Sequence, residues 1–124
     1  MNAPKRTPNG LNKRGRAYWK ITTEAYELTD SEQALLLEVC RCLDNLDQLA
    51  AAIETHGAMV AGAAGQPVVN PALTEARGQR AILHRLIAAL ALPDVDGDAV
   101  PTGHSLRGAA ANQARWKGHK RVAG

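Results

Sequence analysis

One segment, "LTDSEQALLLEVCRCLDNLDQLAAAIETHG" at residues 28–57, constrains the fold more than any other part of the chain. The intervals between its apolar residues alternate between four and three, through Val39, Leu43, Leu46, Ala50 and Ile53. This is the period of a long amphipathic helix with a heptad-like seam. Leu35, Leu36, Leu37 and Leu49 widen the apolar stripe, which predicts packing against more than one neighbour.

Local signals bound this helix at both ends. Asp30 is the expected N-cap, since its carboxylate can accept from free amides of the first turn, and Gln33 stands at the reciprocal capping-box position. Gly57 is expected to end the helix. The segment therefore predicts a helix from about residue 31 to residue 56.

A second long helix is expected to start inside "GQPVVNPALTEAR", residues 65–77. Asn70 is a favoured N-cap, and Pro71 suits the first helical position because it has no amide to leave unpaired. Apolar residues then mark one face up to the break at Pro93: Ala72, Ala76, Leu83, Leu86 and Leu90, with Ile82 and Ile87 beside them.

The linker between the two long helices predicts a small β-hairpin. Met59 and Val60 are expected opposite Val68 and Val69, with residues 62–65 forming the turn. Pro67 restricts its strand to a sheet edge, because proline has no amide to donate.

The N-terminal residues 1–14 lack an apolar period and predict a flexible basic arm. Residues 15–93 are the expected helical core and oligomerisation domain, which starts with a short helix near Gly15. Residues 94–124 are the expected linker and basic tail. The predicted fold is mainly all-α, with a short N-terminal helix, a long antiparallel helical hairpin and a small β-hairpin between the long helices.

Charge is strongly segregated along the 124 residues, although the net charge is only +3. Residues 1–20 hold six basic residues and no acid, residues 21–99 have a net charge of −8, and residues 100–124 hold five basic residues and no acid. Two basic ends on an acidic body indicate a polyanion or an acidic partner, or else solvated disordered tails.

Two stretches resemble metal-binding or nucleotide-binding motifs, but both lack residues that the motif requires. Residues 94–98, "DVDGD", resemble the start of a calcium loop, but Ala99 and Ser105 replace the required Gly and closing Glu. Residues 10–17, "GLNKRGRA", have phosphate-loop glycine spacing without its Lys or hydroxyl. We therefore expect no catalytic residue, no metal ligand, no cofactor and no enzyme activity.

The two cysteines, Cys40 and Cys42, point about 200° apart on a helix and are not expected to pair. The sequence shows neither a signal peptide nor a long apolar span, so a reducing cytoplasm is the expected setting, with no membrane contact.

Taken in order, three stretches resemble the small subunit of phage terminases, as found in tailed phages and prophages. They are "GRAYWKITTEAYELTDSE", "LEVCRCLDNLDQLAAAIETHG" and "GQPVVNPALTEARGQRAILHRLIAALALP". The Asn-Pro-Ala-Leu-Thr-Glu-Ala-Arg run, with Gly-Gln-Pro before it and Leu-Pro after it, is the most specific part. The resemblance covers about two-thirds of the chain, from Gly15 to Pro93.

The resemblance implies a non-enzymatic packaging factor in the host cytoplasm that forms a homo-oligomeric ring. It would recognise the packaging start site on concatemeric double-stranded viral DNA and bring it to the large terminase subunit, which is the ATPase and nuclease. Many small subunits carry an N-terminal helix-turn-helix, and no clear one is found here. A small DNA-binding transcription regulator of phage or host origin is the alternative, and a nuclease is a third, less favoured hypothesis.

Three sets of residues are expected to carry these roles. DNA contact is expected from the N-terminal cations Lys5, Arg6, Lys13, Arg14, Arg16 and Lys20. Contact with the large subunit is expected from the tail residues Arg107, Arg115, Trp116, Lys117, Lys120 and Arg121. Oligomerisation is expected along the leucine seam at Leu36, Val39, Leu43, Leu46 and Ile53.

Overall fold

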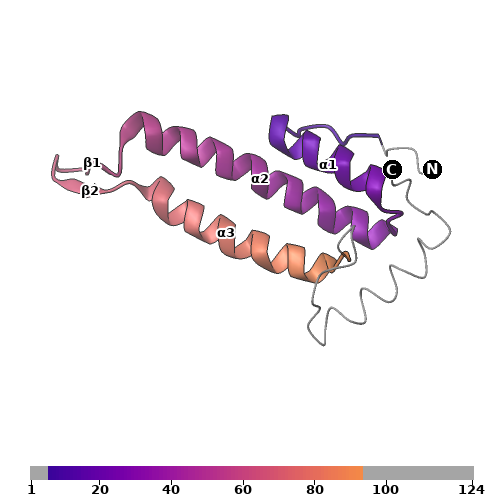
Figure 1. Ribbon diagram of the computed structural model, residues 1–124. Helices are drawn as coiled ribbons and strands as arrows, with labels where there is room; N and C mark the ends of the chain where they lie inside the picture. The colour runs from indigo at the N-terminus through magenta and orange to yellow at the C-terminus, as the bar shows by residue number, and fades with distance from the viewer. Residues whose placement is uncertain (1–5, 94–124) are drawn as a thin grey trace.

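The computed structural model describes residues 6–93, and these form three helices and one small sheet (Figure 1). A short helix α1 (Lys13–Ala25) precedes the long helix α2 (Asp30–His56). The strands β1 (Met59–Ala61) and β2 (Pro67–Val69) follow, and α3 (Pro71–Leu90) completes the described chain. The prediction of a mainly helical protein with a small two-stranded sheet is confirmed.

The start of α2 differs by one residue from the prediction. Thr29, not Asp30, is the N-cap: its hydroxyl accepts from the Glu32 amide at 3.2 Å, and the Glu32 carboxylate accepts from the Thr29 amide at 2.9 Å. The capping box therefore uses Glu32, whereas the Gln33 side chain donates to the carbonyl of Leu28. Threonine and aspartate are both good N-caps. Thr29 is favoured because Glu32, three residues later, completes the capping box.

The joint between the long helices forms as predicted. Met59 pairs with Val69 and Val60 with Val68 in an antiparallel ladder, and the turn closes with a 2.9 Å hydrogen bond from the Gly65 amide to the Gly62 carbonyl. Gly65 has a φ of +84°, a value that side chains disfavour. The hairpin projects beyond the ends of both long helices (Figure 1).

Asn70 links the end of α2 to the start of α3. Its side-chain oxygen accepts from the Ala72 amide at 2.9 Å, as expected of an N-cap, and Pro71 occupies the first turn. The side-chain amide of Asn70 also donates to the Gly57 carbonyl at 2.9 Å, and its backbone amide donates to the Ala58 carbonyl. Asn70 is buried, so the joint is a rigid hydrogen-bonded corner.

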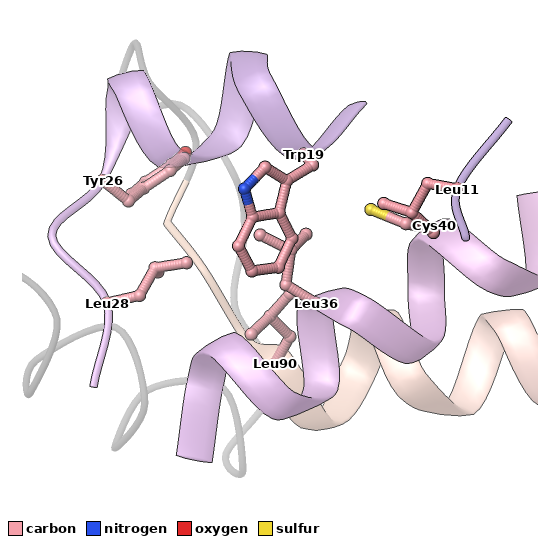
Figure 2. Packing of buried hydrophobic residues seen from close by; sticks show 7 residues of the cluster. All are labelled: Leu11, Trp19, Tyr26, Leu28, Leu36, Cys40 and Leu90. Carbon is pink, nitrogen blue, oxygen red and sulfur yellow. The ribbon is translucent and has the colours of Figure 1, made fainter. Parts of the chain in front are cut away.

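Helix α3 packs antiparallel to α2, and α1 lies along the N-terminal half of α2 (Figure 1). The hydrophobic core lies where all three helices meet, around the Trp19 indole (Figure 2). Its buried members are Leu11, Trp19, Tyr26, Leu28, Leu36, Cys40 and Leu90. The Tyr26 hydroxyl donates to the Pro93 carbonyl, which ties the segment after α1 to the segment after α3.

The folded core begins earlier than residue 15. Helix α1 starts at Lys13, and Leu11 is only 4% exposed and lies beside Cys40 (Figure 2). The predicted flexible arm therefore does not extend to residue 14. Its C-terminal part belongs to the packed domain, because Leu11 is buried and the Asn12 amide donates to the Asp44 carboxylate.

The leucine seam of α2 is used mainly inside the chain. Leu36 and Val39 are fully buried and Leu43 is 7% exposed, so these three cannot form the predicted contact between copies without opening the fold. Leu46 and Ile53 are half-buried. A heptad period demands a partner helix, and here the chain's own α1 and α3 supply it.

Candidate nucleic-acid interface

Helix α1 carries four of the six cations that the sequence assigned to DNA. Lys13, Arg14, Arg16 and Lys20 are all exposed on it, and Arg6 is exposed in the segment before it. Lys5 lies outside the described residues. Arg16 and Lys20 lie in the short helix that the sequence predicted, and the structure adds Lys13 and Arg14 to this helix, where the sequence predicted the end of a flexible arm.

Helical spacing places three of the cations together. Lys13, Arg16 and Lys20 stand at positions i, i+3 and i+7, which share one face of a helix. The buried residues of α1 lie on other positions of the helix: Gly15, Trp19, Thr22 and Thr23. We call Lys13, Arg16 and Lys20 the α1 cationic face.

Asp44 of α2 holds the N-terminus of α1 in place. One carboxylate oxygen accepts from the Gly15 amide at 2.7 Å, and the other accepts from the Asn12 amide, also at 2.7 Å. The Asn12 side chain makes no capping bond of its own. A buried carboxylate from another helix therefore satisfies two free amides of α1, where the helix dipole also favours negative charge.

Gly15 makes this close approach of the helices sterically feasible. A Cβ atom at residue 15 would lie 2.7 Å from the Cys40 carbonyl oxygen and closer still to an Asp44 carboxylate oxygen. Only glycine therefore allows α1 to sit against α2 at this point, and the direction of the neighbouring cations follows from it.

The α1 cations differ in their partners. Arg14 donates to Asp47 of α2 at 3.0 Å, with both side chains about half exposed, so the pair contributes little to stability. Lys13, Arg16 and Lys20 form no ion pair within residues 6–93. Their charge is therefore available to a ligand.

A shallow groove lies beside α1, between it and α3. Its lining residues are Arg14, Ala17, Tyr18, Ile21, Leu43 and Ile87, and its volume is about 240 Å³. Ile21 is 63% exposed and Ile87 is 46% exposed, so two isoleucines face solvent at its mouth. Residues of α1 and α3 thus line the same groove, together with Leu43 of α2.

A second group of basic residues lies on α3 and was not singled out from the sequence. Arg77, Arg80, His84 and Arg85 are all exposed on this helix. Their spacing of three, four and one residues would have revealed them. The net charge of residues 21–99 concealed them, because that sum includes the many acids of α2.

The two cysteines are expected to be unreactive. Both are free and buried, and burial, reinforced by the nearby Asp44 carboxylate, raises the pKa of Cys40 from 9.0 to about 12. Burial and the Glu38 carboxylate also raise the pKa of Cys42. Protonated thiols are poor nucleophiles and poor metal ligands.

Within residues 6–93, no group of three or more His, Cys, Asp or Glu side chains is arranged to hold a metal ion. None of the helices in this part of the chain has the length and hydropathy of a membrane span. The tail residues assigned to the large subunit, Arg107, Arg115, Trp116, Lys117, Lys120 and Arg121, lie outside the described residues.

Comparisons with family models, with curated proteins and with solved structures each found no match to this chain.

Proposed function

We propose that this protein is a phage terminase small subunit, a DNA-binding packaging factor without catalytic activity of its own. The observation that carries the DNA-binding part is the α1 cationic face: three exposed cations on a rigid helix, with no acid paired to them in the described chain. Such a surface attracts phosphates and releases counterions on binding. The quoted sequence stretches support the assignment to packaging.

The Asp44 contact strengthens this proposal because it makes the cations part of the fold. An arm would lose conformational entropy on binding DNA, whereas a helix anchored by two 2.7 Å hydrogen bonds has already lost it. Lys13, Arg16 and Lys20 would contact the phosphate backbone. Arg14, already beside Asp47, would contribute less.

Oligomerisation into a ring remains part of the proposal, with a revised surface. The apolar residues away from the α1 and α3 cations that a neighbouring copy could cover are the exposed Met59 and Val69, together with the half-buried Leu46 and Ile53. Met59 and Val69 form a cross-strand pair on the projecting hairpin and are 52% and 57% exposed. Contacts between unlike surfaces of identical chains close into rings when the rotation allows it.

Recruitment of the large subunit separates packaging from transcription regulation. We expect the full chain to retain a cognate large terminase subunit in a pull-down and to form one closed assembly by light scattering. Deleting residues 105–124 should abolish retention while the assembly and most DNA affinity remain. Control of a promoter without any large-subunit binding would favour the regulator instead. Metal-dependent DNA cleavage by the pure protein would favour a nuclease.

A further inference from the structure

The outward surface of α3 is strongly cationic. Arg77, Arg80 and Arg85, which we call the α3 cationic face, are exposed beside His84, and they form no ion pair within the described residues. Helix α3 has a single acid, Glu75. Three unpaired arginines on one short stretch of helix repel one another, so a binding partner with negative charge would relieve that repulsion.

Several small side chains lie among these cations, beside the exposed Ile82. Gly78 and Ala81 are exposed on the same stretch, and Ala88 lies one turn beyond His84. A Cβ atom added at Gly78 would meet no other atom within 4 Å, so the chain's own packing does not require a glycine there. The long arginines therefore project from a low surface, which lets a partner approach the helix closely.

The length of the α3 cationic face suits a phosphate backbone. Eight residues separate Arg77 from Arg85, which corresponds to about 12 Å along a helix. One strand of B-DNA advances about 3.4 Å per phosphate along the duplex axis, so a helix parallel to that axis would span roughly three to four phosphates over this length. Arginine also binds phosphate through two parallel N–H donors.

Part of the α3 cationic face borders the same groove as α1. Ile87 lines that groove, and His84 and Arg80 stand three and seven residues before it on α3, so they share its face. Arg14 lines the groove from α1. Arg14 of α1 and Arg80 of α3 therefore both lie near this groove.

We propose that the α3 cationic face is a second surface for the phosphate backbone of double-stranded DNA, acting together with the α1 cationic face. This inference rests on the DNA binding proposed above and extends it to residues that the charge balance of the sequence concealed. We favour the phosphate backbone as the ligand because the three arginines follow one another along the helix with no acid paired to them in the described residues.

The test measures the affinity of the full chain for a fluorescent 30-base-pair duplex of mixed sequence over a series of salt concentrations. The α3 variant carries Arg77→Gln, Arg80→Gln and Arg85→Gln, and the α1 variant carries Lys13→Gln, Arg16→Gln and Lys20→Gln. Arg41→Gln is the control, because Arg41 is an exposed cation of α2 that is paired with Glu38. Glutamine keeps a helix propensity close to that of arginine, so folding should be retained.

The α3 variant should weaken binding about tenfold or more near 0.1 M salt and reduce the magnitude of the log-log salt slope by about 2 to 3, at roughly 0.9 per lost phosphate contact. Should the triple variant fold poorly, Arg80→Gln alone should reduce the slope by about 0.9. An α3 variant with an unchanged slope, or one that changes the mass of the assembly and leaves DNA binding intact, would overturn the inference. Loss of DNA binding in the α1 variant alone would contradict the α3 inference and would still support the proposed function. Absence of DNA binding by the unsubstituted chain would contradict both the inference and the proposed function.

Discussion

Asp44 caps a helix to which it does not belong. Its carboxylate spans the Asn12 and Gly15 amides at the start of α1, although the two helices are separated in sequence by 32 and 29 residues at these bonds. The contact fixes where α1 begins and which way its cations point. The fold and the candidate interface therefore depend on the same buried side chain.

Replacing Asp44 with Asn should lower the free energy of unfolding by about 1 to 3 kcal/mol. The asparagine side chain has one oxygen acceptor in place of two, so one of the two backbone N–H groups that Asp44 binds would be left unsatisfied. Asp47→Asn, one turn further along α2, is the matched control and should cost less than about 1 kcal/mol, since its ion pair is exposed. Denaturant titrations measure both. Equal effects would mean that the Asp44 hydrogen bonds do not matter in solution.

Gly15 and Gly78 form a second matched pair, because both lie within helices and only one has neighbours. Gly15→Ala should destabilise the protein by more than about 1 kcal/mol, since its Cβ would meet Cys40 and Asp44. Gly78→Ala should instead stabilise it by up to about 1 kcal/mol, the usual gain in helix propensity. Thermal melts would contradict this account if the two changes moved stability in the same direction.

Asn70→Ala should lower stability by about 1 to 2 kcal/mol, because it removes both the N-cap of α3 and the side-chain bond to the Gly57 carbonyl. DNA affinity per folded molecule should stay the same. Unfolding curves and binding assays on one preparation address both points. A fully folded variant that no longer binds DNA would show that the joint is part of the interface.

Stability should fall as pH rises through the alkaline range. The folded pKa of Cys40 is about 12 and its ordinary value is 9.0, so between these values the unfolded chain loses a proton that the folded chain keeps. That difference favours unfolding by about 4 kcal/mol near pH 12. The free energy of unfolding should therefore decline more steeply in the natural chain than in Cys40→Ala. Parallel pH profiles would show that Cys40 does not contribute.

Signals that are local in sequence predicted most of the fold. The 4-3 apolar period, the Asn-Pro start of α3 and the valine pairs around residues 62–65 each involve residues within one or two turns of one another. The Asp44 contact joins distant residues and has no local signature, which is why the start of α1 and the extent of the arm were misplaced. A heptad period also cannot show whether its partner helix belongs to the same chain or to a copy, and in the described chain Leu36, Val39 and Leu43 are already buried.

The candidate interface was predicted only in part, for a related reason. The α1 cations were identified because no acid lies near them in sequence. The net charge of residues 21–99 adds the arginines of α3 to the acids of α2. In the structure, however, the arginines of α3 are exposed to solvent. Charge acts through its position on the folded surface, and a sum over residues does not contain that position.

The salt dependence of DNA binding tests the central claim most directly. For the natural chain and for the Lys13→Gln, Arg16→Gln, Lys20→Gln variant, the dissociation constant for a short duplex is measured from about 0.05 to 0.2 M salt. We expect the variant to fold normally and to reduce the magnitude of the log-log slope by about 2 to 3. Identical slopes for the two folded proteins would contradict the claim that α1 presents its cations to DNA.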